Sequence, residues 1–175
     1  MHTGISLYFA SGYEANAEVV AKAQATGCHY AFTSLHIPEE EGIDYRTEAR
    51  KLLELCREAE INLIADISPV TLSKLGVQKF DELAELGITY VRLDFGFDAA
   101  ETVELSHKFH VVFNASTITK DDISAWQAAG ADFTRFAACH NYYPKSYTGL
   151  SLERVAQINA RLSALGFQIF SFVPG

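Results

Sequence analysis

Short runs of β-branched and aromatic residues recur along the chain, separated by longer amphipathic segments. The runs predict strands over residues 4–9, 29–35, 62–68, 90–95, 110–116, 132–140 and 168–175. Between them, apolar residues spaced i, i+3, i+4 and i+7 predict helices, most clearly over residues 14–25, 45–58, 77–86 and 152–165. Strands that alternate with helices indicate βαβ units, whose right-handed crossovers lay the strands parallel and in sequence order.

Glycines end several of the helical segments just before the next strand, as expected for a left-handed cap residue: Gly27, Gly87, Gly130 and Gly166. No strand is followed by GxGxxG, so the usual signature of a dinucleotide-binding sheet is missing. We therefore expect an α/β fold of the (β/α)8 TIM-barrel type, with about seven of the eight strands present.

The number of predicted strands leads to a further expectation. A closed barrel of this type needs an eighth strand, and the sequence stops directly after the seventh run. Residues 1–175 are then an incomplete barrel domain with an open strand edge. Because an unpaired edge invites pairing with another chain, we expect that the protein could form a homo-oligomer through it.

Polar residues stand in i, i+2 pairs near the ends of four predicted strands: Ser6 and Tyr8, Asp66 and Ser68, Arg92 and Asp94, and Asn114 and Ser116. Because side chains alternate along a strand, both members of a pair point the same way. In a barrel the pairs would converge on the carboxyl-terminal mouth, where barrel enzymes keep their chemistry. Helix capping is the alternative role for Ser68 and Ser116.

Composition excludes several classes of function. The chain has 175 residues and a formal net charge of −8, and it lacks the basic cluster that a nucleic-acid partner requires. No apolar run approaches the roughly 18 residues of a membrane helix, and the amino terminus lacks the basic lead of a signal peptide. We expect a cytoplasmic protein whose cysteines, Cys28, Cys56 and Cys139, are reduced.

Six motifs occur in order along the chain: GISLYF, FTSLHIPEE, ADISP, LGITYVRLDFGF, FNAS and CHNYYPKSYTGLS. With them the chain resembles the N-terminal domain of the MupG-type 6-phospho-N-acetylmuramidases, from about Gly4 to Gly175. The resemblance implies a TIM barrel followed by a smaller β-rich domain, which this sequence does not contain. It also implies hydrolysis of the β-1,4 bond between N-acetylmuramic acid 6-phosphate and N-acetylglucosamine in cell-wall recycling, with no cofactor.

Glycoside hydrolysis commonly uses two carboxyl groups, about 5 to 9.5 Å apart. Asp66 and Asp94, at the ends of neighbouring strands, are the predicted catalytic pair, and the sequence does not divide acid from base or nucleophile. Glu39 in the loop HIPEEEG is a competing acid, although a run of glutamates is more often a solvated loop. Arg92 could bind the phosphate or the lactyl carboxylate, or keep Asp94 ionised.

The stretch ACHNYYPKSYTGLS is expected to run from the sixth strand over the mouth into the next helix. Its histidine and amide could bond sugar hydroxyls or phosphate, and its tyrosines could stack on a pyranose ring. The predicted substrate contacts are Tyr8, Ser34, His36, Glu39, Ser68, Arg92, Asn114, Ser116, His140, Asn141, Tyr142, Tyr143, Lys145 and Thr148.

Two other functions stay open at this point. The first is a metal-dependent barrel hydrolase or lyase that uses Asp66, Asp94 and His140 as ligands, although no HxH or HExxH motif supports it. The second is a non-catalytic sugar-phosphate-binding protein, or a barrel fragment that associates through its open edge. For the glycosidase and for the sugar-phosphate-binding protein, the expected partner is a small phosphorylated amino-sugar disaccharide. We expect neither a nucleic-acid partner nor a membrane partner.

Overall fold

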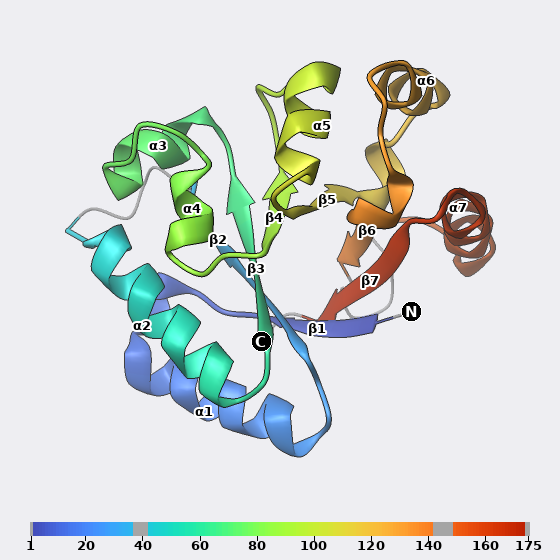
Figure 1. Cartoon of the computed structure of the whole chain (residues 1–175). Helices are drawn as coiled ribbons and strands as arrows, with labels where there is room; N and C mark the ends of the chain where they lie inside the picture. The colour runs from blue at the N-terminus through green and yellow to red at the C-terminus, as the bar shows by residue number, and fades with distance from the viewer. Residues whose placement is uncertain (1, 37–41, 142–148, 174–175) are drawn as a thin grey trace.

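A computed structural model of the chain describes residues 2–36, 42–141 and 149–173. Within these residues, parallel strands pair in sequence order and close into a barrel surrounded by helices (Figure 1). The strands are β1 His2–Ser6, β2 Tyr30–Ser34, β3 Asn62–Ile67, β4 Tyr90–Leu93, β5 His110–Asn114, β6 Phe136–Asn141 and β7 Gln168–Val173. The helices are α1 Tyr13–Ala25, α2 Tyr45–Glu58, α3 Pro69–Leu75, α4 Glu82–Glu85, α5 Ala99–Ser106, α6 Lys120–Ala128 and α7 Leu152–Leu165.

The predicted α/β fold of the TIM-barrel type is confirmed, but the expected open edge is wrong. β1 pairs with β2 on one side and with β7 on the other, in a register that runs from His2 opposite Phe170 to Ile5 opposite Val173. Both edges that an open sheet would expose are therefore used within the barrel. Self-association through an open edge loses its structural support.

The core has two layers, one on each side of the barrel wall. Ile64, Val112 and Phe170 fill the barrel interior, while residues such as Phe109 and Phe136 pack between the strands and the helices. All five are completely buried. Strands buried on both faces read as nearly continuous apolar runs, which explains why strict alternation is weak in this sequence.

Local hydrogen bonds explain where the observed elements differ from the predicted ones. The helices over 45–58 and 152–165 are confirmed, and α3 is an additional helix. The segment predicted as a helix over 77–86 is helical only in α4, because the Glu82 side chain accepts from the backbone N–H groups of Gln78 and Lys79 and closes a turn. The strand predicted from 132 begins at Phe136, because the Asp132 side chain caps a 3-10 turn.

Aromatic rings close the amino-terminal end of the barrel. Tyr90 stacks on His110 with ring centroids 4.6 Å apart, and Tyr30 meets Phe170 at 4.7 Å. The ring of His110 also contacts Arg135, and burial together with that positive charge lowers the pKa of His110. The opposite, carboxyl-terminal end of β3 and β4 carries the polar residues Asp66, Arg92 and Asp94.

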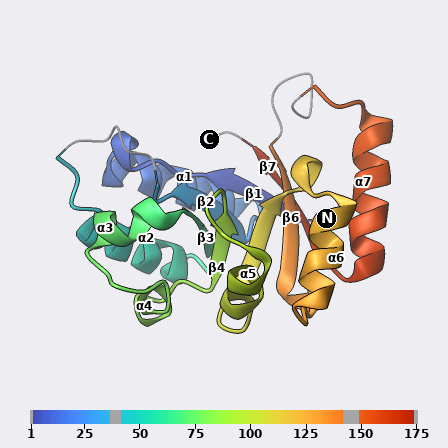
Figure 2. The same ribbon diagram turned by 90° about the horizontal axis from the view of Figure 1, so that it is seen from above.

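The helices form an outer layer around this barrel. Figure 2 shows α1, α2 and α3 on one side and α6 and α7 on the other, with α5 between the two groups. None of the helices within the described ranges is long and apolar enough to cross a bilayer.

Candidate active site

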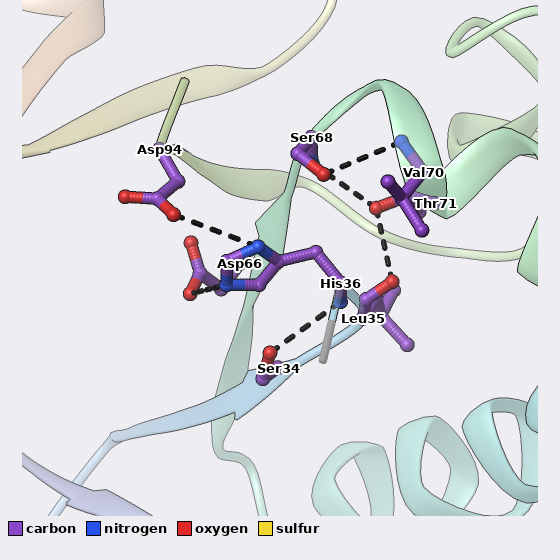
Figure 3. A network of polar contacts seen from close by, with 8 residues as sticks. All are labelled: Ser34, Leu35, His36, Asp66, Ser68, Val70, Thr71 and Asp94. Atoms are coloured by element: carbon purple, nitrogen blue, oxygen red, sulfur yellow. Dashed lines mark hydrogen bonds and ion pairs between the residues drawn. The ribbon is translucent and has the colours of Figure 1, made fainter. Parts of the chain in front are cut away.

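The imidazole of His36 lies between two carboxylates at the carboxyl-terminal mouth (Figure 3). His36 Nε2 is 2.9 Å from Asp66 Oδ2, and His36 Nδ1 is 3.5 Å from Asp94 Oδ2. The strand order that places Asp66 and Asp94 at the ends of adjacent strands thus brings them to the same histidine. Both predicted catalytic residues and one predicted substrate contact form a single cluster.

The barrel register and the loop after β2 together hold His36 in place. Ser34, Asp66 and Arg92 are direct neighbours across β2, β3 and β4. The backbone N–H of Leu35 donates to the Asp66 carbonyl at 2.8 Å, and Thr71 Oγ1 donates to the Leu35 carbonyl at 3.0 Å. These bonds anchor the residue before His36 to β3 and α3, so the ring is carried on a fixed backbone (Figure 3).

Asp94 follows the last residue of β4 and is held by its own backbone. Its N–H donates to the Ile67 carbonyl at 3.3 Å, which continues the ladder one residue beyond the strand. The chain then turns at Gly96, whose φ is +81°. A Cβ at this position would come within 2.9 Å of Pro69 Cγ. Glycine therefore permits both the left-handed turn and the close approach of this loop to α3.

The two carboxylates lie in unequal environments. Asp66 is 5% exposed, and its Oδ1 is buried with no hydrogen-bond partner among the described residues. The Asp94 side chain is 41% exposed. Burial raises the pKa of the Asp66 carboxyl, against the opposing effects of the Arg92 and His36 charges. Asp66 thus favours its protonated form more than a solvated aspartate does, while Asp94 is open to the mouth.

Arg92 points into the barrel one layer below Asp94. Its guanidinium lies over the ring of Phe32, 5.2 Å from the ring centroid. Arg92 forms no ion pair with any described residue, and its Nε is buried without a hydrogen-bond partner among them. An inward-facing cation that forms no ion pair with a described residue is suited to a negatively charged ligand.

Several predicted substrate contacts take part in local caps. Ser68 is fully buried and caps α3, with its side chain accepting from Val70 N–H. The Asn114 side chain accepts from the backbone N–H and the hydroxyl of Ser116. The Ser34 hydroxyl accepts from His36 N–H at 3.4 Å. Tyr8 is 44% exposed after β1.

His140 does not join the mouth cluster. Cys139 faces the barrel interior, so alternation directs His140 to the outer face, where its Nε2 is 2.7 Å from Asn159 Oδ1 on α7. The hypothetical metal set of Asp66, Asp94 and His140 is therefore not brought together. No group of three or more His, Cys, Asp or Glu within the described ranges could hold a metal ion.

The remaining predicted contacts fall outside the described side chains. Asn141 ends β6, and no side-chain placement is described for it. The other five lie outside the described residues: Glu39, Tyr142, Tyr143, Lys145 and Thr148.

One residue at the mouth was missed from the sequence. Phe95 is 56% exposed, and its ring centroid lies 6.1 Å from that of His36. Its position directly after Asp94, in a glycine-containing turn after a strand, was the available signal. An exposed aromatic ring beside the carboxylates offers an apolar face to a pyranose ring.

The buried cysteines have no place in this chemistry. All three cysteines are free thiols. Burial raises the pKa of Cys56 to about 12 and that of Cys139 to about 11. Both therefore stay protonated at neutral pH and behave as small apolar residues.

Comparison with known families identifies the family to which this barrel belongs. The family described as "6-phospho-N-acetylmuramidase, N-terminal" matches residues 3–175. The chain belongs to this family. The resemblance drawn from the six motifs is confirmed, and the description of the 6-phospho-N-acetylmuramidase family supports a glycosidase-type barrel.

Solved structures resemble this member of the 6-phospho-N-acetylmuramidase family to different degrees. A conserved protein of unknown function from Enterococcus faecalis is 34% identical, with a TM-score of 0.84. The match covers 100% of this chain and 49% of that one, so the chain spans about half the length of that relative.

More distant structures share the fold alone. Thiamine phosphate pyrophosphorylase from Pyrococcus furiosus is 14% identical with a TM-score of 0.56, over 98% of this chain and 85% of that one. The phospho-2-dehydro-3-deoxyheptonate aldolase from Thermotoga maritima is 12% identical with a TM-score of 0.58, over 99% and 59%. No curated protein matches the chain.

Proposed function

We propose that this barrel hydrolyses the β-1,4 bond between N-acetylmuramic acid 6-phosphate and N-acetylglucosamine. The observation that carries the proposal is the pair of carboxylates on either side of His36, at the mouth of a barrel of the 6-phospho-N-acetylmuramidase family. Because such a substrate would be phosphorylated on uptake during cell-wall recycling, we also propose that it is handled in the cytoplasm.

The unequal burial of the carboxylates supports different roles. Asp94 is the exposed member and would meet the sugar from the mouth, as nucleophile or as base. Asp66 and His36 together would hold the proton that the leaving oxygen needs, because burial raises the pKa of Asp66. The two carboxylates are separated by one imidazole ring and two polar contacts, a spacing compatible with the roughly 5 to 9.5 Å of glycosidase pairs.

Groups around the pair suit the rest of the substrate. Arg92 has no ionic partner among the described residues and could neutralise the phosphate or the lactyl carboxylate. Phe95 could pack against a pyranose face. The same barrel end thus offers a cation, an aromatic platform and a proton-holding pair.

The test is to incubate the protein with the disaccharide in its 6-phosphorylated and unphosphorylated forms and to follow release of N-acetylglucosamine by mass spectrometry. We expect cleavage of the phosphorylated form and much slower cleavage of the other. Tight binding without release would instead favour a non-catalytic sugar-phosphate-binding protein. Absence of both binding and release would contradict both functions.

A further inference from the structure

Two side-chain hydroxyls hold the peptide group that joins Leu35 to His36. The Leu35 carbonyl accepts from Thr71 Oγ1 at 3.0 Å, and the His36 N–H, at the other end of the same peptide, donates to Ser34 Oγ at 3.4 Å. Figure 3 shows both contacts. Because a peptide group is planar, fixing its carbonyl and its N–H fixes the direction in which the His36 side chain leaves the backbone.

The rest of Leu35 is already fixed, so the orientation of this peptide is the remaining freedom. Leu35 is 1% exposed within the core, and its N–H donates to the Asp66 carbonyl at 2.8 Å. Rotation about the bond between the Cα and the carbonyl carbon of Leu35 would turn the following peptide without breaking either contact. The hydrogen bond from the Thr71 hydroxyl opposes this rotation.

The start of α3 holds Thr71 in turn. Thr71 is completely buried, and its hydroxyl oxygen accepts from the Ser68 N–H at 3.1 Å in the capping box of the helix. Ser68 follows Asp66 by two residues on the same backbone. One hydroxyl therefore links the backbone that carries Asp66 to the backbone that carries His36, whose side chains meet at 2.9 Å.

We propose that Thr71 and Ser34 are positioning residues, whose hydroxyls orient the peptide before His36 and thereby keep the imidazole against Asp66. The inference rests on the proposed function, in which Asp66 and His36 together hold the proton for the leaving oxygen. Because Thr71 is completely buried, solvent does not reach its hydroxyl. A substitution that removes the hydroxyl leaves the Leu35 carbonyl without its donor and lets the peptide turn.

The position of the imidazole also affects how tightly Asp66 holds its proton. Four charged or titratable groups face Asp66: His36, Arg92, Asp94 and Cys139. Burial raises the pKa of Asp66, and the charges of Arg92 and His36 and the His36 hydrogen bond oppose this effect. When the imidazole moves away and the other three groups stay in place, Asp66 should hold its proton to higher pH.

The test compares Thr71→Val with Thr71→Ser, which keeps the hydroxyl. We expect Thr71→Val to lower kcat for the 6-phosphorylated disaccharide by at least about tenfold, to leave KM nearly unchanged and to move the loss of kcat at high pH to higher pH still. Thr71→Ser should return all three towards the unsubstituted protein. Without substrate, the NMR signals of the imidazole nitrogens, assigned by their loss in His36→Gln, should change in Thr71→Val and stay in place in Thr71→Ser.

Ser106→Ala is the matched control. Ser106 is 2% exposed, and its hydroxyl donates to the Val103 carbonyl on α5 at 2.6 Å. Its own carbonyl accepts from Arg135, which also contacts His110 at the amino-terminal end of the barrel, away from the mouth. This substitution also removes a buried hydrogen bond from a hydroxyl to a carbonyl. It should lower Tm but change neither kcat, nor the pH dependence of kcat, nor the imidazole signals.

Each outcome decides the inference. Unchanged imidazole signals in Thr71→Val, or a loss of kcat that Ser106→Ala shares, would overturn it. If Thr71→Val does not fold, Ser34→Ala decides in the same way, because it removes the acceptor at the other end of the same peptide. If the imidazole signals change as expected but the unsubstituted protein does not cleave the disaccharide, the proposed function fails while the positioning of His36 stands. If the disaccharide is cleaved and Thr71→Val keeps its kcat and its imidazole signals, the function stands and the positioning role fails.

Discussion

Replacing Asp66 by asparagine should stabilise the protein while impairing its chemistry. Asp66 is 5% exposed, its Oδ1 lacks a hydrogen-bond partner among the described residues, and burial raises its pKa. The folded state therefore binds the Asp66 proton more tightly than the unfolded chain, so ionisation at neutral pH costs folding free energy. A neutral amide of the same shape removes that cost.

The magnitude follows from removal of the buried charge. Asparagine still places a polar atom at the unpartnered Oδ1 position, so the gain is about 1.4 kcal/mol for each unit by which the folded-state pKa of Asp66 exceeds the unfolded value. Loss of the attraction to His36 and Arg92 opposes the gain. We expect a net stabilisation of about 1–2 kcal/mol at neutral pH, which raises Tm by about 2–8 °C for a chain of this size.

The difference in unfolding free energy between Asp66→Asn and the unsubstituted protein depends on pH, and measuring this dependence is the assay. Because the folded-state pKa is raised, the proton's stabilising contribution is fully present below the unfolded value of about 3.9 and is lost as pH rises through the raised value. The gap in unfolding free energy between Asp66→Asn and the unsubstituted protein should therefore open over that window. Urea unfolding at several pH values measures it.

The matched control is Asp94→Asn. The Asp94 side chain is 41% exposed, so this substitution should change the unfolding free energy by no more than about 0.5 kcal/mol. The reasoning is refuted if Asp66→Asn is no more stable than the unsubstituted protein at neutral pH, or if the gap does not grow with pH.

Four further measurements test the groups around this pair. First, kcat should fall as pH rises through the raised pKa of Asp66, because the proton donor is then ionised. Second, His36→Gln should lower kcat by about 100-fold. It should also move the fall in kcat to higher pH, since the His36 charge lowers the pKa of Asp66. Third, Arg92→Gln should raise KM for the phosphorylated disaccharide by about 10- to 100-fold, with less effect on the unphosphorylated one; equal effects would argue against an anion site. Fourth, Phe95→Ala should raise KM by up to about tenfold without lowering Tm, because the ring is 56% exposed.

The periodicity of the sequence predicted the architecture but not the closure of the barrel. The helix over 45–58 and the strand near 62–67 follow from local patterns, and their alternation implies parallel order. Pairing of β1 with β7 depends on a register between segments far apart in the chain, from His2 opposite Phe170 onward. No local pattern encodes that register, so counting strands alone suggested an open edge.

The residues of the candidate site could be predicted from the sequence, but most of their geometry could not. Strand order alone brings Asp66 and Asp94 to the same end of neighbouring strands, with Asp66 opposite Arg92 and Asp94 two residues further along. Their unequal burial depends on how α3 and the loop carrying His36 pack over β3, and this packing cannot be derived from spacing. His140 was predicted at the mouth, and this prediction is wrong. Side chains alternate along β6, so Cys139 faces the barrel interior and His140 faces outward.

The most direct test of the account is kcat for cleavage of the 6-phosphorylated disaccharide by Asp66→Asn and Asp94→Asn, beside Glu104→Gln as a control at an exposed carboxylate on α5. The account predicts a loss of about 100-fold or more for each aspartate variant and no change for the control. Folded Asp66→Asn and Asp94→Asn proteins that cleave the disaccharide as fast as the unsubstituted protein would contradict it.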